Sequence, residues 1–178
     1  MRQIVLLRGI NLGSRNRVAM PTLRKLLADA GFEDVRTYVQ SGNVVLTSEL
    51  KPDALARQCE RLIADELGLR IDVVVRTRAE LASVVRRNPL GKVADDPKRY
   101  QVTFLAGKPP RKLVDELAAV AEPPERFEAH GRELYAWHPA GVARSKLWAK
   151  LGGRNLGITA TSRNWTTVEK LLELASDR

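Results

Sequence analysis

Cysteine, histidine and aromatic residues are scarce in this chain, and their scarcity excludes several classes of protein. One cysteine and two histidines among 178 residues cannot build a disulfide framework and leave few ligands for a zinc module. Aromatic residues make up only 5%, so rings for stacking on nucleic-acid bases are sparse. We therefore expect no metal and no cofactor, and a fold that rests on its hydrophobic core.

Long hydrophobic runs and common catalytic signatures are missing as well. The first apolar run, Ile4 to Leu7, is far shorter than the about 7–15 residues of a signal peptide or the about 20 of a membrane span. The patterns Gly-x-Ser-x-Gly, His-x-x-x-His and Cys-x-x-Cys do not occur. We expect a cytoplasmic protein that does not bind membranes, and no catalytic residue can be assigned from motifs.

Basic charge is abundant and unevenly placed. Lysine and arginine number 30 against 21 acidic residues, which gives a net charge of +9. Residues 1–28 contain six basic side chains and no acid, and residues 134–168 contain five and no acid. The five are Arg144, Lys146, Lys150, Arg154 and Arg163. This segregation favours one shared positive surface, and the alternative is two separate solvated faces.

Hydrophobic periodicity predicts the order of the secondary-structure elements. The first half shows strands over 3–7, 35–39, 44–47 and 71–75 and helices over 21–31 and 52–68, in the order β-α-β-β-α-β. A helix over 77–87 follows. The second half shows a strand over 100–104, a hairpin around His130-Gly131 and helices over 113–121, 145–151 and 164–175. We expect an α+β protein of two ferredoxin-like subdomains (alpha-beta plaits), residues 1–80 and 81–178, with antiparallel sheets and helices on one face.

Two conspicuous side chains are predicted to be core residues. Cys59 shares one helical face with Leu55 and Ile63, and no basic partner lies beside it in the sequence. Trp165 shares a helical face with Val168 and is expected to pack inside the protein in preference to forming a ligand platform.

Three motifs resemble one bacterial family. They are Leu7-Arg-Gly-Ile-Asn11 followed by Met20-Pro21, Val35-Arg-Thr-Tyr-Val-Gln-Ser-Gly-Asn-Val44, and Ala160-Thr-Ser-Arg-Asn-Trp-Thr-Thr-Val168. In this order they are similar to the bacterial domain of unknown function family 1697, with the strong match over residues 5–47 and 158–172. The resemblance implies two ferredoxin-like subdomains and implies no biochemical activity.

The segment from Arg8 to Met20 is the first candidate site. It is longer than the about 2–6 residues usual between a strand and a helix. Its candidate ligand-binding residues are Arg8, Asn11, Arg15, Asn16 and Arg17. A position before a helix N-terminus suits an anion, although the glycine spacing matches neither a P-loop nor a dinucleotide fingerprint. The alternative is a solvated loop whose asparagines stabilise its own turns.

Two further segments supply candidate residues. Arg163 precedes a helix for which Asn164 suits the N-cap, so helix dipole, free amides and guanidinium favour an anion there. The alternative is an ion pair between Arg163 and an acid of the first subdomain. Gln40 and Asn43 lie in a hairpin turn whose geometry alone also accounts for them. Lys146, from the second basic window, completes the set.

Three functions are compatible with these observations. We prefer a non-enzymatic module that binds an anionic ligand, either nucleic acid or a phosphorylated small molecule, through a basic surface. One alternative is an enzyme acting on a small phosphorylated or carboxylated substrate at the subdomain junction, for which no general base is evident. The other is a protein-interaction or assembly module. The preferred hypothesis places Arg8, Asn11 and Arg163 close together at the junction.

Overall fold

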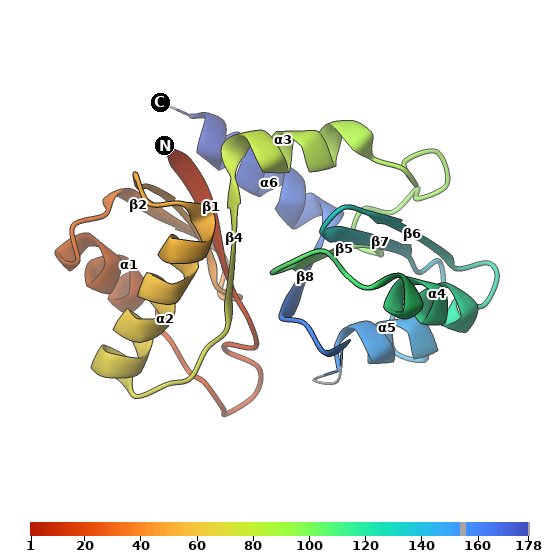
Figure 1. The fold of residues 1–178 in the computed structure, drawn as a ribbon, viewed down its shortest axis with the longest axis horizontal. Helices are drawn as coiled ribbons and strands as arrows, with labels where there is room; N and C mark the ends of the chain where they lie inside the picture. Colours follow the sequence, from red (N-terminus) through yellow and green to blue (C-terminus); the bar gives the residue numbers. More distant parts are fainter. Residues whose placement is uncertain (154–155, 178) are drawn as a thin grey trace. The chain divides into compact units, whose positions relative to one another are not determined.

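Two compact units make up the computed structural model of this chain, which describes residues 1–153 and 156–177 (Figure 1). Contacts group Met1–Ala82 with Lys170–Arg178 as the first unit and Ser83–Glu169 as the second. The expected division into subdomains of residues 1–80 and 81–178 stays a prediction. Within the described residues, no helix is long and apolar enough to span a bilayer.

The first unit is built on a four-stranded sheet in the order β2-β3-β1-β4. Its elements are β1 (Arg2–Leu7), α1 (Met20–Asp29), β2 (Glu33–Tyr38), β3 (Asn43–Thr47), α2 (Pro52–Leu67) and β4 (Val73–Thr77). Strand β1 pairs antiparallel with both β3 and β4, and β2 pairs antiparallel with β3. Two helices that each connect non-neighbouring strands give the ferredoxin-like topology expected from the sequence.

Proline and glycine set the ends of both helices in this unit. Proline occupies the first turn of α1 and of α2, where its missing N–H removes no helical hydrogen bond. After α1, Gly31 has φ +95° and the Phe32 amide donates back to the Leu27 carbonyl at 3.2 Å. After α2, Gly68 has φ +66° and donates to the Ala64 carbonyl at 3.0 Å. Glycine adopts this left-handed conformation without the penalty of a Cβ atom.

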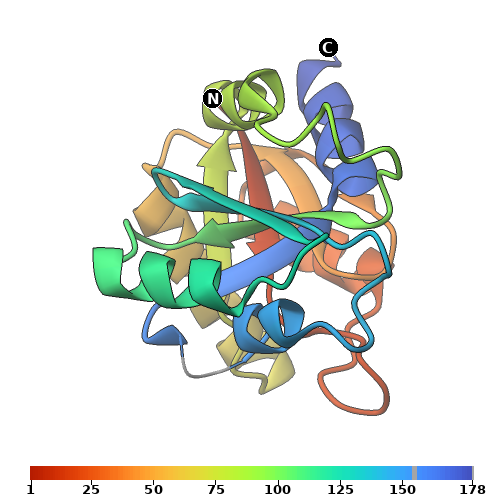
Figure 2. The same cartoon turned by 90° about the vertical axis from the view of Figure 1, so that its right-hand side faces the viewer.

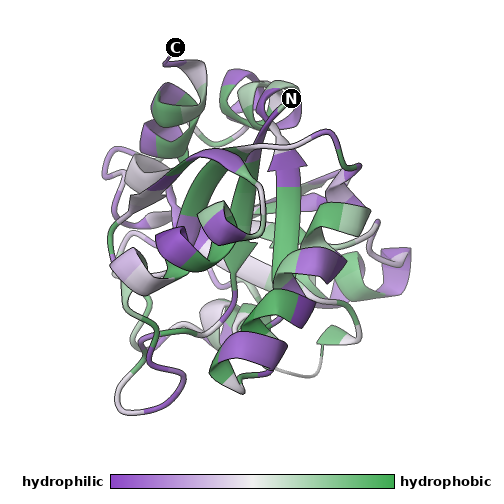
Figure 3. Ribbon diagram, turned by 90° about the vertical axis from the view of Figure 1, so that its left-hand side faces the viewer, coloured by the Kyte–Doolittle hydropathy of each residue, from purple (hydrophilic) through white to green (hydrophobic). Residues whose placement is uncertain are grey.

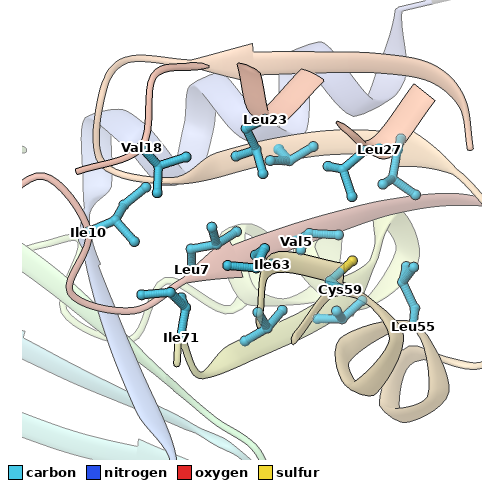
Figure 4. Close-up of a cluster of buried hydrophobic side chains, with 14 of the residues drawn as sticks. Val5, Leu7, Ile10, Val18, Leu23, Leu27, Leu55, Cys59, Ile63 and Ile71 are labelled. Carbon is cyan, nitrogen blue, oxygen red and sulfur yellow. The ribbon is translucent and has the colours of Figure 1, made fainter. Parts of the chain in front are cut away.

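One face of the first sheet carries the core of this unit. Val5 and Leu7 of β1 project toward Leu23 and Leu27 of α1, and Cys59 comes from α2 (Figure 4). Strand residues that alternate along the chain share one face, and helix residues three or four apart do the same, which explains the pattern. Strands β1, β3 and β4 are largely apolar, whereas β2 is mostly polar and the helices alternate between apolar and polar sides (Figure 3). Cys59 is 1% exposed, so its predicted core position is confirmed.

The second unit repeats this topology. Its elements are β5 (Tyr100–Leu105), α4 (Arg111–Val120), β6 (Arg126–His130), β7 (Glu133–Trp137), α5 (Lys146–Leu151) and β8 (Ala160–Asn164), and the sheet order is β6-β7-β5-β8. Helices α4 and α5 lie on one face of the sheet (Figure 2), where Leu117 and Leu147 join a buried cluster with Leu134. Two further helices, α3 (Arg78–Arg87) and α6 (Trp165–Ser176), contribute residues to both units.

Strand β8 is the element that the sequence reading missed. Residues 160–164, Ala-Thr-Ser-Arg-Asn, were expected only to lead into the last helix, but they pair antiparallel with β5 from Leu105↔Ala160 to Gln101↔Asn164. The segment is short and mostly polar, so it lacks the alternation typical of a strand. It is a strand because its backbone hydrogen-bonds to β5, and this pairing completes the second ferredoxin-like sheet.

Candidate functional site

The strand-to-helix segment, residues 8–19, which we call the basic loop, is tied to the hairpin turn at residues 39–42. The Asn11 side-chain Nδ2 donates to the carbonyl oxygens of Gln40 at 2.7 Å and Val18 at 2.8 Å. The Asn11 Oδ1 accepts from the Val18 amide at 2.8 Å. Each of these bonds gives a partner to a backbone N–H or C=O group that the irregular loop and turn would otherwise leave unpaired. Asn11 therefore acts within the protein as a clamp for the loop.

Asparagine and glycine also give this loop its turns. Asn11 and Asn16 have φ values of +54° and +50°, and Gly9 and Gly13 have +65° and +64°. Asparagine tolerates this region better than other residues with a Cβ atom. The Asn11 amide donates to the Asn16 carbonyl at 3.0 Å. These contacts agree with the alternative given above, in which the asparagines stabilise the turns of the loop itself. Contact of Asn11 or Asn16 with a ligand stays a prediction.

The hairpin turn places glycine where no larger residue fits. Gly42 has φ +82°, and a Cβ atom there would stand 2.7 Å from the Leu7 Cβ and 2.9 Å from Ile10 Cδ1. Its carbonyl accepts from the Leu7 amide at 2.9 Å. Asn43 is fully buried, and its Nδ2 donates to the Tyr38 carbonyl at 3.1 Å. Asn43 is thus placed inside the hairpin, whereas the Gln40 side chain is exposed.

The arginines of the basic loop differ in exposure. Arg15 and Arg17 are exposed, whereas Arg8 is half-buried and its backbone amide donates to the Asp72 carbonyl at 2.9 Å. The loop holds no acidic residue. Two guanidinium groups therefore face solvent from a loop whose backbone is held by its own asparagines, an arrangement that can attract a phosphate or carboxylate.

Arg163 and Asn164 lie in β8 and are engaged by their own neighbours. Arg163 is 8% exposed, and its Nη1 donates to Thr161 Oγ1 at 2.7 Å and to the Ser162 carbonyl at 2.9 Å. Burial lowers the pKa of Arg163 to about 10. Asn164 Oδ1 accepts from the Thr167 amide at 2.9 Å, which confirms the predicted N-cap of α6. Arg163 therefore stands in a buried strand, not in an open loop before the helix.

Trp165, at the start of α6, is a core residue as predicted. It is 6% exposed and stacks on Tyr100 of β5 with ring centroids 4.7 Å apart and an interplanar angle of 14°. Its Nε1 donates to Glu169 Oε1 at 2.9 Å, which satisfies the one polar atom of the ring. At 6% exposure the indole is not presented as a platform for a ligand base.

The expected meeting of Arg8, Asn11 and Arg163 stays a prediction. Arg8 and Asn11 belong to the first unit and Arg163 to the second, and each unit is described by itself. The same holds for the single positive surface expected from the two basic windows. Arg154, one of the five basic residues of the second window, lies outside the described residues.

A polar cluster that the sequence reading missed lies within the second unit. His138 Nδ1 donates to Glu125 Oε2 at 2.6 Å, and Ser145 Oγ donates to the same oxygen at 2.6 Å. The Ser145 Oγ also accepts from the Trp148 amide at 3.0 Å, as the N-cap of α5. Burial alone would raise the pKa of Glu125, but hydrogen bonds from Ser145 and His138 outweigh it, so that pKa lies below its usual value.

His138 is fully buried at the centre of this cluster. Its ring meets Trp148 edge to face, with centroids 5.7 Å apart. Its Nε2 is a buried atom without a hydrogen-bond partner among the described residues. Local sequence does not reveal this pair, because Glu125 is thirteen positions from His138, across the β6–β7 hairpin. The only local signal was Ser145, which has the residue type and position of a helix N-cap.

A cavity of about 510 Å³ opens beside this cluster. Glu125 and Ser145 line it together with Arg144 and Lys146. Lys146, a candidate from the sequence, pairs with Glu122 at 3.2 Å, and both side chains are largely exposed. Across residues 1–153 and 156–177 no group of three histidine, cysteine or acidic side chains is arranged to hold a metal ion.

Comparison with known proteins identifies the family. A solved structure, conserved bacterial protein SP0830 from Streptococcus pneumoniae, is similar with a TM-score of 0.81 and 21% sequence identity over 98% of each chain, a likeness that shows the fold. No curated protein matches the chain. The family model "Protein of unknown function (DUF1697)" matches residues 1–135, which is most of the sequence. This chain therefore belongs to the DUF1697 family.

Proposed function

We propose that this protein binds an anionic ligand, nucleic acid or a phosphorylated small molecule, through its basic loop. The observation that carries the proposal is the exposure of Arg15 and Arg17 on a loop that contains no acid and is held by Asn11. A loop already held in one conformation loses less entropy when it binds a ligand. Guanidinium groups match the geometry of phosphate oxygens and keep their charge at any physiological pH.

The net charge of +9 supports the same proposal through electrostatic attraction that acts at longer distances. A positive protein raises the local concentration of polyanions and speeds their encounter with the surface. The scarcity of aromatic residues argues against base stacking, so contacts to phosphates would dominate affinity. Affinity dominated by phosphate contacts falls steeply with salt.

The enzymatic alternative is less well supported by the geometry. Glu125 is the carboxylate that stands in a cavity beside a serine hydroxyl, and its pKa is lowered. A general base works best when its pKa lies near the working pH, so a carboxylate of lowered pKa is a weak base at neutrality. This cluster supplies hydrogen bonding more readily than proton transfer.

The experiment measures fluorescence anisotropy of labelled single- and double-stranded RNA and DNA with the full-length protein, at about 50 and 200 mM salt. The test variant is the double substitution Arg15→Gln and Arg17→Gln. The matched control is Arg111→Gln with Lys112→Gln, which removes the same charge from exposed positions on α4 in the other unit. Unlabelled tripolyphosphate is added as a competitor to report recognition of phosphate without bases.

We expect the loop variant to bind at least about tenfold more weakly and to lose about two units of slope in a plot of log affinity against log salt. The control should lose much less. Equal losses in both double variants would make the effect one of net charge alone and would contradict the loop as the site. Absence of binding to nucleic acid and to tripolyphosphate at low salt would refute the proposal.

A further inference from the structure

The cavity in the second unit has the size and lining of a small-molecule site. Its volume of about 510 Å³ lies within the about 300–1,000 Å³ typical of such sites. Pro124, Pro139 and Ala143 give it apolar walls, and Glu125 and Arg144 bring opposite charges to it. All of these residues belong to the second unit, so the cavity lining shares no residue with the basic loop of the first.

Glu125 presents a negative charge to the cavity. The Oε2 atom takes both neighbouring donors, from His138 and Ser145, each at 2.6 Å. The Glu122 backbone also hydrogen-bonds to this carboxylate and helps to lower its pKa, so Glu125 stands ionised in the cavity lining. An ionised carboxylate has about four lone-pair sites, so one that is held in place at a cavity wall is suited to accept from an ammonium group as well.

Arg144 brings a positive charge to the same cavity. It is exposed, and its guanidinium has no ion pair or hydrogen bond with the described part of the chain. The neighbouring cation Lys146 differs, because its charge is offset by Glu122 at 3.2 Å. Arg144 and Glu125 are therefore the charged lining residues that lie outside the Lys146–Glu122 ion pair. One is suited to an anionic group and the other to a cationic one.

The cluster does not have the arrangement of a serine nucleophile. The Ser145 Oγ proton points to Glu125, and its lone pairs serve the Trp148 amide. His138 Nδ1 lies 2.6 Å from the carboxylate oxygen and 3.3 Å from Ser145 Oγ, so its shorter contact is with Glu125, and its Nε2 is buried without a partner in the described structure. In a catalytic triad the histidine stands between serine and acid and accepts the serine proton. Here both donors converge on Glu125 and hold its position and charge, which is a binding role.

We propose that this cavity binds a small zwitterion, with its ammonium group at Glu125 and its carboxylate or phosphate group at Arg144. Free amino acids and phosphorylated amino alcohols are the ligands of this chemical class. The paired charges explain why a cavity of a strongly basic protein keeps an ionised glutamate held by two donors. The apolar walls would pack against the side chain or methylene carbons of the ligand.

The first experiment is thermal unfolding of the full-length protein followed by fluorescence, with the twenty standard L-amino acids and phosphoethanolamine as probes. A ligand that binds only the folded protein raises the midpoint as its concentration passes the dissociation constant. Ethylamine, which is alanine without its carboxylate, and propionate, which is alanine without its ammonium group, serve as single-charge controls. Inorganic phosphate is a third control. Titration calorimetry then measures the affinity of any stabilising probe.

The decisive variant is Arg144→Ala, because this side chain is exposed and has no partner among the described residues whose loss would unfold the protein. Loss of one charged hydrogen-bond donor should weaken the zwitterion about tenfold or more. Glu125→Gln should weaken it as well, and it is interpreted only if circular dichroism shows the native fold. Arg111→Ala, an exposed arginine on α4 outside the cavity lining, is the matched control and should bind as the parent protein does.

The proposal is supported if a zwitterion stabilises the protein, if neither ethylamine nor propionate does so alone, and if Arg144→Ala abolishes the effect. It is overturned if no probe stabilises the protein, if inorganic phosphate or propionate alone binds as tightly, or if Arg144→Ala leaves binding unchanged. The nucleic-acid test uses variants of Arg15 and Arg17, and the zwitterion test uses variants of Arg144 and Glu125. Failure of either proposal can therefore be distinguished from failure of the other.

Discussion

Asn11 and Gln40, which are twenty-nine positions apart, are joined by a hydrogen bond of 2.7 Å from the Asn11 Nδ2 to the Gln40 carbonyl oxygen. This bond links two of the motifs that carry the family resemblance, the one that begins at Leu7 and the one that ends at Val44. Both motifs have a structural role here. The first provides the side-chain clamp, and the second provides the turn that the clamp holds.

The clamp predicts that Asn11→Asp destabilises the protein by about 2–3 kcal/mol. Aspartate tolerates the same φ of +54° and can still accept from the Val18 amide. It cannot donate, so two carbonyl oxygens would face a carboxylate oxygen in place of an N–H group. Urea unfolding measures the loss. The control is Asn11→Gly, which removes the side chain and keeps the backbone conformation; it should be milder than the aspartate variant, and the reverse order would contradict the clamp.

Gly42→Ala should be severely destabilising, by about 3 kcal/mol or more. The new Cβ would stand 2.7 Å from Leu7 Cβ at a φ of +82°, so steric overlap adds to backbone strain. Gly13→Ala is the matched control, because its φ of +64° is similar and nothing lies within 4 Å of the added atom. That variant should lose only about 1 kcal/mol. Similar losses in chemical denaturation would show that overlap at Gly42 is relieved by movement of the hairpin.

Cys59 should be unreactive in the folded protein. Burial raises the pKa of its thiol to about 12, and the reactive thiolate is therefore scarce at neutral pH. A chromogenic disulfide reagent at about pH 8 should label it orders of magnitude more slowly in buffer than in denaturing urea. Rapid labelling of the native protein would contradict its place in the core.

The stability of the second unit should depend on the charge of Glu125. Its folded-state pKa lies below the ordinary value of 4.5, so its contribution is fully present above about pH 4.5 and is lost as the pH falls through the folded pKa. Glu125→Gln removes that contribution at all pH values. The parent should therefore be about 1–2 kcal/mol more stable than the variant at neutral pH, with the difference shrinking toward about pH 3. A difference that does not change over this range would contradict the hydrogen-bonded role of the ionised carboxylate.

The sequence by itself determined most of the fold and only part of the candidate site. Periodic apolar residues, Pro52 and Gly68 predict α2 closely, because helix formation and helix ends depend on residues near one another in the chain. The same locality explains the hairpin at His130-Gly131 and the buried positions of Cys59 and Trp165. Strand β8 escaped because a short polar strand is defined by the neighbour with which it pairs, here β5.

Only the tertiary structure decided which polar side chains are free to act. Arg15 and Arg163 look alike in the sequence as basic residues in acid-free windows, yet one is exposed and the other is buried in a strand. Glu125, His138 and Ser145 converge because the β6–β7 hairpin and the start of α5 bring distant positions together. Local sequence encodes backbone preferences through short-range sterics and periodicity. The exposure, ionisation and partners of a side chain depend on contacts that exist only once the chain has folded.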